Sequence, residues 1–165
     1  MAKRIVWLTL FLFFTGFLFA QIDGALEAAD DAYDSDNFEE AISILEGALP
    51  EAAREAERAE VYWRLSRATL ALGDRRRDAE AGEDELLPIF EEGEEYADRA
   101  IEADPDNHLG YFWKSANIGR WGQTKGILNS LVKAEPMRKL LMEAIDREPE
   151  HAESYYVLGQ LYEKV

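Results

Sequence analysis

Side chains that commonly carry enzyme chemistry are scarce in this chain of 165 residues. It contains no cysteine, which excludes thiol catalysis, disulfides and cysteine-ligated metal sites. Its two histidines, His108 and His151, are too few for a multi-histidine metal centre. Ser66, Ser115 and Ser154 have no histidine at a matching place in the pattern, and acidic pairs are too frequent to single out a general acid or base. We therefore predict that the chain is not an enzyme and has no catalytic residue, cofactor or metal.

The overall charge limits the partners of the chain. Asp and Glu number 34 against 18 Lys and Arg, which gives a formal net charge of −16 at pH 7. Such a chain repels phosphate backbones and anionic lipid headgroups. We therefore predict no nucleic-acid partner and no polybasic contact with a membrane. The hydrophobic share of 47% is that of a folded domain with a core.

Aromatic and basic side chains recur at one spacing in this acidic chain. Tyr62, Tyr111 and Tyr155 begin three similar helical runs. Each tyrosine is followed by another aromatic residue, and arginine or glutamine comes one turn later in two of the runs, on the same helix face. Arginine can bind a carboxylate through two hydrogen bonds, and aromatic rings supply contact area. We predict that these side chains line a concave strip that binds an anionic or partly apolar ligand or partner. The candidate binding residues are Trp63, Arg67, Phe112, Arg120, Tyr156 and Gln160.

An alternative interpretation of the same strip is structural. Trp63 and Phe112 also suit packing between neighbouring helices, and the arginines can pair with nearby acidic residues. Trp113 and Trp121 lie eight residues apart on nearly one helix face, and we expect them to bury against an apolar helical run at 127–132. Both alternatives remain open at the level of sequence.

The elements that must position these side chains follow an internal repeat. Similar phrases at 96–105 and 140–149 each end in proline, and each is followed by a polar pair and an aromatic-rich run. Proline ends a helix because it lacks an N–H donor and disfavours helix in the residue before it. No strand-like alternation is found after residue 20. The sequence predicts helices at about 24–35, 38–53, 58–73, 88–103, 108–121, 124–134, 136–147 and 151–165.

Small residues recur in register with the tyrosines. Ala29, Ser66, Ser115 and Gly159 allow two helices to approach closely. This pattern resembles the tetratricopeptide repeat, a helix–turn–helix unit of about 34 residues. The longer spacing of the tyrosines implies two insertions, at 75–87 and at 123–135, and Pro88 is expected to begin the helix after the first.

The repeat resemblance implies an all-α fold. Its tetratricopeptide-like helical hairpins would stack, around the two insertions, into a right-handed superhelical array. The predicted domain covers 21–165, divided into units at about 22–55, 59–107 and 108–151 and a partial unit at 152–165. The last helix would then have an uncovered flank, which favours either a fragment or an end that is covered by a partner.

The first 20 residues have the order of a secretory signal peptide. Lys3 and Arg4 precede an apolar run at 5–19, and Ala20 and a polar segment follow. We predict an exported protein with cleavage after Ala20. An uncleaved N-terminal anchor is the alternative, because the run becomes marginally long enough to span a bilayer when it is extended to Ile22.

The aromatic segment at 110–122, together with 151–162, supports a narrower resemblance. It is similar to the TatT-like periplasmic helical-repeat proteins associated with tripartite ATP-independent periplasmic (TRAP) transporters, and a similar arrangement occurs in eukaryotic microtubule-dynamics regulators. The former resemblance implies a periplasmic adaptor that partners a solute-binding protein and binds a small carboxylate or hydrophobic ligand. The alternatives are a scaffold in cell-envelope assembly that holds a peptide in its concave groove, and a hydrolase.

Overall fold

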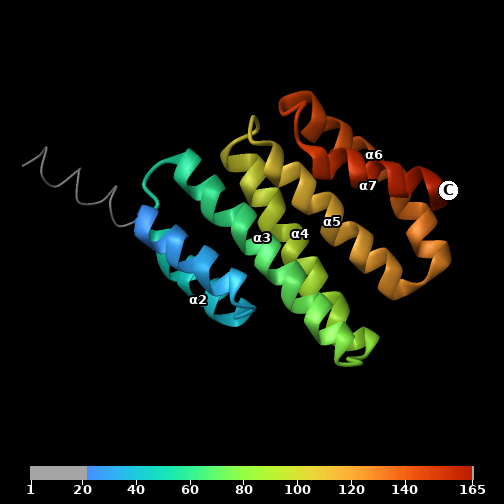
Figure 1. Ribbon diagram of the computed structural model, residues 1–165, viewed down its shortest axis with the longest axis horizontal. Coiled ribbons are helices and arrows are strands. Elements are labelled where there is room, and N and C mark those ends of the chain that lie inside the picture. The colour runs from blue at the N-terminus through green and yellow to red at the C-terminus, as the bar shows by residue number, and fades with distance from the viewer. Residues whose placement is uncertain (1–21, 165) are drawn as a thin grey trace, which may run out of the picture.

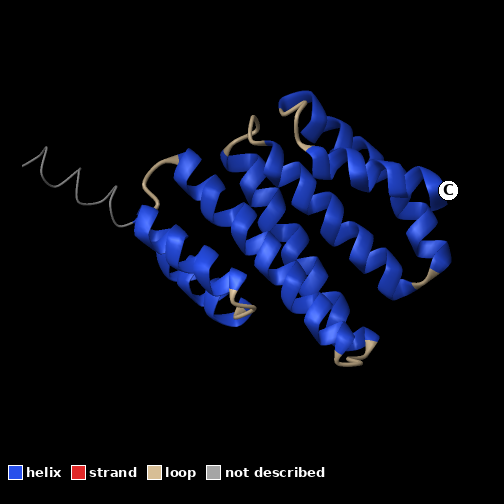
Figure 2. Ribbon diagram, in the orientation of Figure 1, coloured by secondary structure: helices blue, strands red, loops and turns tan. Residues whose placement is uncertain are grey.

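The part of the chain that the structure describes consists of helices joined by short loops. A computed structural model describes residues 22–164, and no strand occurs among them (Figure 2). The all-α class predicted from the sequence is confirmed. The predicted signal peptide at 1–20 lies outside the described residues.

The helices follow one another across the molecule in chain order, as the colours of Figure 1 show. A first helix covers 22–34. The later elements are α2 (Phe38–Ala48), the short 3-10 helix η1 (Leu49–Glu51), α3 (Glu55–Asp78), α4 (Glu83–Ala103), α5 (His108–Lys125), α6 (Ile127–Arg147) and α7 (Ala152–Lys164). The long helix α3 packs against α2, α4 and α5, and α6 packs against α5 and α7.

Two prolines lie inside helices, where the sequence predicts a helix start and a helix break. Pro88 is the sixth residue of α4, and Pro136 lies within α6, which is one helix where two were predicted. Each proline costs a backbone hydrogen bond. Leu87 and Phe90 beside Pro88 are buried, as is Ala134 before Pro136. Apolar burial beside each proline offsets the lost bond, so the helix continues through it.

The centre of the fold is packed around α3 and α4. Phe90, Leu65 and Val61 are fully buried there, and Leu45 of α2 joins them. Gly73 faces Phe90 so closely that an added Cβ would lie 2.8 Å from Cζ of the ring. These contacts make α3 and α4 the most tightly packed pair in the described chain.

A buried polar cluster ties α3, α4 and α5 together. The Ser66 hydroxyl donates to the carbonyl oxygen of Gly93 at 2.7 Å, and the Asn117 side-chain amide donates to the Ser66 hydroxyl at 3.0 Å. The same amide donates to the Trp113 carbonyl at 3.0 Å. Gly93 permits this approach, since a Cβ there would lie 2.6 Å from Cγ of Asn117. The three helices are thereby held in one register.

The two proline turns that begin α5 and α7 have the same hydrogen bonds. At Asp104, before Pro105, the carboxylate accepts from the backbone N–H two residues later at 3.1 Å, and the carbonyl accepts from the third residue at 3.2 Å. At Glu148, before Pro149, the corresponding distances are 3.2 and 3.1 Å. The similar phrases in the sequence therefore form similar turns.

Candidate functional site

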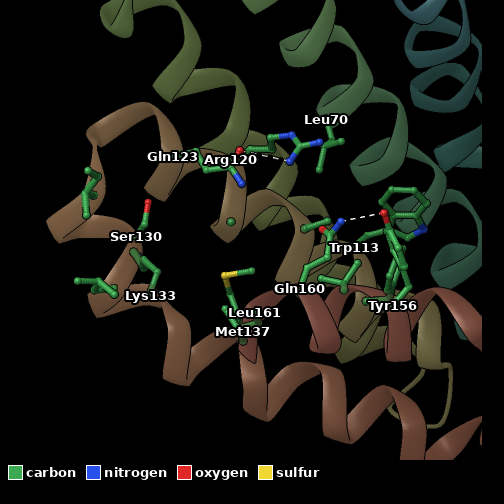
Figure 3. Close-up of a pocket in the computed structure, with 16 residues that line it drawn as sticks. Leu70, Trp113, Arg120, Gln123, Ser130, Lys133, Met137, Tyr156, Gln160 and Leu161 are labelled. Carbon is green, nitrogen blue, oxygen red and sulfur yellow. Dashed lines mark hydrogen bonds between the residues drawn. The ribbon is translucent and has the colours of Figure 1, made fainter. Parts of the chain in front are cut away.

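A cavity of about 560 Å³ opens between α5, α6 and α7 (Figure 3). Its volume is within the range of ligand pockets in proteins. Most of its wall is apolar, with a few polar side chains. The lining residues are Leu70, Phe112, Trp113, Ala116, Gly119, Arg120, Gln123, Ile127, Ser130, Leu131, Lys133, Met137, Tyr156, Val157, Gln160 and Leu161.

Glycines at the end of α5 shape the cavity. Gly126 has φ +99°, a conformation that side chains rarely adopt, and it turns the chain directly from α5 into α6. Gly122 lets the two helices meet just before this turn, because a Cβ there would lie 3.2 Å from Cα of Ser130. Helices α5 and α6 pack along each other from this joint, and α7 completes the wall of the cavity.

The start of α7 is held against the start of α5 by an aromatic cluster. The His151 ring meets His108 edge-on with centroids 4.7 Å apart, and it meets Phe112 at 4.9 Å. Nδ1 of His151 lies 2.7 Å from the Ser154 hydroxyl. Burial and the neighbouring His151 lower the pKa of His108 from 6.5, against the opposing effect of nearby glutamates. The cluster fixes where α7, and with it Tyr156, stands.

The charged residues that line the cavity are both cations, in a chain whose net charge is strongly negative. Arg120 is held by Asp74 of α3, with Nε 2.7 and 3.0 Å from the two carboxylate oxygens. Lys133 lies across the cavity on α6 (Figure 3), with its ammonium 4.7 Å from the ring centroid of Trp121. Among residues 22–164 Lys133 forms no salt bridge. Because Asp74 pairs with Arg120, the charge on the cavity wall that has no salt bridge in the described chain is that of Lys133.

Four of the six predicted binding residues line this cavity. Phe112 and Arg120 come from α5, and Tyr156 and Gln160 come from α7, where the Gln160 amide donates to the Tyr156 hydroxyl at 2.8 Å. The structure thus brings the predicted residues of the second and third helical runs together at one cavity. Their role in binding stays a prediction.

The other two predicted residues, Trp63 and Arg67, lie elsewhere on α3. Trp63 is buried and its indole N–H donates to Glu60 at 3.0 Å. Arg67 forms an ion pair with Asp30 of the first helix and stacks 4.0 Å from the ring centroid of Tyr33. The first helix covers this end of the expected strip, so it is not continuous. For these two residues the structure agrees with the packing and ion-pair alternative.

Sequence reasoning missed the side of the cavity that α6 provides. The apolar run at 127–132 was expected to cover Trp113 and Trp121, and that expectation is wrong because Ile127 and Leu128 are 81% and 79% exposed. Trp113 packs near Leu141 instead, and the Trp121 indole donates to Glu91 at 2.8 Å. The helical period of the run was a correct signal, but a period does not say whether its apolar face is covered.

Two further properties of the described residues bear on the site. Across 22–164 no group of three or more histidine, aspartate or glutamate side chains is placed to hold a metal ion. Over the same range, each helix is either too short or too polar to cross a bilayer.

Fold and cavity together define the class: an all-α protein of sequentially packed helices with an apolar cavity bordered by cations. A family model described as regulator of microtubule dynamics protein 1-3 matches residues 25–165. The chain belongs to this family. It is 30% identical over 139 residues to the cattle regulator of microtubule dynamics protein 1, covering 84% of this chain and 41% of that protein. The orangutan protein of that name is 28% identical over 140 residues, covering 85% and 42%.

This family overturns the assignment to TatT-like periplasmic proteins. The matched relatives come from mammals, whose cells have no periplasm, and their name concerns microtubules. The predictions of a TRAP-transporter adaptor, an envelope scaffold and an exported periplasmic protein with a signal peptide are therefore wrong. The aromatic motifs at 110–122 and 151–162 suit both families and therefore do not distinguish between them. The chain spans about two fifths of the length of the curated relatives it matches.

Proposed function

We propose that this chain is a protein-binding module that takes part in regulating microtubule dynamics and binds its partner at the α5–α6–α7 cavity. The observation that carries the proposal is the family match over 25–165, which includes every residue of the cavity wall. The chain covers about two fifths of its curated relatives, so the proposal concerns this helical module alone. Binding, rather than catalysis, also suits a chain without cysteine and with only two histidines.

We further propose that the helices form a tetratricopeptide-like array of hairpins, right-handed and interrupted by the two insertions. The repeated hydrogen bonds at Asp104 and Glu148 support it, since equivalent turns begin α5 and α7. The small residues Ser66 and Ser115, predicted as equivalent, are both fully buried at helix contacts. Arrays of this kind present an extended surface to other proteins.

Exposed apolar area next to the cavity favours a protein partner. Ile127, Leu128 and Val132 lie on the first turns of α6 with most of their surface in solvent. Contiguous apolar patches of this kind commonly mark interaction sites. Direct binding to an anionic polymer through charge is disfavoured for a chain of net charge −16. The module is therefore expected to act on microtubules through another protein.

The test is made where such partners are present. Growth, shortening and catastrophe rates of single microtubules are measured in cytoplasmic extract, with and without the purified full chain. The proposal expects a change in at least one rate, and expects the double variant Leu128→Glu with Val132→Glu to abolish it. Met142→Glu is the control, because Met142 is also an exposed apolar residue of α6 but lies outside the apolar run at 127–132. Unchanged rates with the unaltered chain would refute the microtubule role.

A further inference from the structure

The first turns of α6 carry an apolar stripe, formed by Ile127, Leu128, Leu131 and Val132. Their exposed fractions are 81%, 79%, 46% and 74%. Residues at i, i+1, i+4 and i+5 lie on one side of a helix, so the four side chains form one surface. A surface that exposes four aliphatic side chains side by side is unusual for a protein in water and calls for a covering partner.

The stripe is continuous with the cavity, but only two of its four residues line the cavity wall. An occupant that covers the whole stripe must therefore be larger than the cavity. Ile127 and Leu131 line the cavity, whereas Leu128 and Val132 do not. A small molecule in the cavity would cover the first pair and leave the second pair in water. A helix laid along α6 would cover all four and could insert a large side chain between Met137 and Tyr156. The stripe thus favours a helical segment over a small ligand.

The charges at the cavity indicate the chemistry of that segment. No aspartate or glutamate lines the wall, while Arg120 and Lys133 do. Asp74 already pairs with Arg120. The ammonium of Lys133 rests on the Trp121 ring without a salt bridge in the described chain, and it is near enough to Glu94 to oppose the rise that burial causes in the pKa of that carboxyl. A carboxylate on the occupant could reach Lys133 and form a charge-assisted hydrogen bond.

We propose that the cavity and the apolar stripe bind an acidic amphipathic helix of a partner protein, with apolar anchors facing α6 and carboxylates beside Lys133. This inference deepens the proposed function, because it names the chemistry of the partner at the same site. A second copy of the chain fits less well, since copies that met through this face would bring their own cations together.

The test is a selection from a peptide library in which acidic and basic peptides compete for the site. A displayed library of 18-residue helical peptides has three apolar anchors at i, i+4 and i+7, and the flanking positions are randomised between glutamate and lysine. It is selected on the full chain, after depletion on the Leu128→Glu, Val132→Glu double variant. The expected result is enrichment of glutamate beside the anchors and micromolar binding. An absence of binders, or equal recovery of lysine, overturns the proposal.

Variants then assign the bound peptide to the site. The double stripe variant is expected to weaken an enriched peptide at least about tenfold, because the substituted carboxylates stand where its apolar anchors pack. The control Met142→Glu leaves the affinity unchanged. Lys133→Glu should weaken the glutamate peptide and strengthen its lysine counterpart. Peptide binding that is insensitive to both the stripe and Lys133 variants overturns the proposal.

The remaining occupants give different results. Oleate that binds the chain more tightly than any peptide, and keeps its affinity in the stripe variant, assigns the cavity to a small amphiphile and overturns the helix proposal. Dimerisation that the stripe variant abolishes, with no peptide selected, assigns the face to a second copy and also overturns it. Selection uses no microtubules, so an acidic peptide found there while microtubule rates stay unchanged refutes the microtubule role alone.

Discussion

The α3–α4 centre and the first half of α6 use similar apolar residues in opposite ways. Around α3 and α4 large side chains such as Phe90 are fully buried, and even the polar cluster of Ser66 and Asn117 is out of contact with water. In α6 the stripe from Ile127 to Val132 meets solvent, and only Ala134, Leu141 and Ala144 are buried. All three helices are well formed, so helicity does not distinguish the two regions.

The difference separates residues that hold the fold from residues that are available for binding. Close helix approach at Gly73 and Gly93 leaves no room in the centre for a ligand. Helix α6 packs closely against α5 at Gly122, yet the stripe on its first turns stays exposed beside the cavity. Stability is expected to depend on the first region, and partner affinity on the second.

The largest effect on stability is expected from truncating a buried side chain between α3 and α4. Phe90→Ala removes a fully buried ring and should lower the free energy of unfolding by about 3–5 kcal/mol. The matched change Tyr156→Ala removes a ring that is 67% exposed and should change it by less than about 0.5 kcal/mol. Urea unfolding of both variants, followed by circular dichroism, measures the contrast. Equal losses would remove the distinction between the two regions.

Adding one methyl group should distinguish close helix approach from open surface. In Gly93→Ala the new Cβ would overlap Asn117 and disturb its bonds to Ser66, which should cost about 1–3 kcal/mol. Gly47→Ala on α2 is the control, since a Cβ there meets nothing within 4 Å. This control should raise stability by up to about 1 kcal/mol, because alanine favours the helix. A neutral Gly93→Ala would show that α4 and α5 can separate.

Acidification should loosen the attachment of α7 more than the centre. The pKa of His108 is lowered in the folded chain, so the unfolded chain takes up the proton at higher pH. Stability is therefore intact at pH 7.5 and falls as the pH drops below about 6.5. Near His108 lie His151, which lowers its pKa, and Glu60, Glu148 and Glu153, which raise it.

The measurement is the melting temperature of the full chain between pH 7.5 and 5.5. His108→Gln cannot take up the proton and should show a smaller fall over this window. Carboxylates held by arginine, such as Glu57 beside Arg54, lose their contribution only at lower pH, because their pKa is lowered from 4.5. A fall that is identical in His108→Gln would assign the pH dependence to groups other than this ring.

The smallest effect on stability is expected at the stripe. The double variant Leu128→Ser with Val132→Ser exchanges exposed aliphatic groups for hydroxyls and should alter the free energy of unfolding by less than about 0.5 kcal/mol. Binding of dyes that recognise apolar surface should decrease at the same time. Thermal melts and dye fluorescence test the pair of outcomes. A large loss of stability would mean that the stripe is buried in solution.

Much of the fold follows from local signals in the sequence. The starts of α5 and α7 were predicted from Pro105 and Pro149, and the acidic residue before each proline accepts the same two local hydrogen bonds. The start of α4 and the unity of α6 were not predicted. Local rules treat Pro88 and Pro136 as boundaries, but burial of apolar neighbours outweighs one missing hydrogen bond.

The candidate site was also predicted only in part, because the sequence repeat places some of its residues and contacts with distant helices place the others. Phe112 and Tyr156 reach one cavity because α5 and α7 begin with equivalent turns, a relation that is visible in the repeat. Trp63 and Arg67 do not reach it, since Asp30 and Tyr33 of the first helix occupy their surroundings. Sequence spacing within a helix cannot indicate which distant helix covers it.

From the amino-acid order alone follow the helical class, the acidic charge, the two equivalent proline turns and the set of apolar helix faces. These depend on neighbours within a few residues, or on composition. Which faces are covered depends on contacts between distant segments, such as Gly93 with Asn117 and Gly122 with Ser130. Those approaches set the distances between helices. They bury the facing sides of α3 and α4 and leave the cavity and the stripe of α6 open.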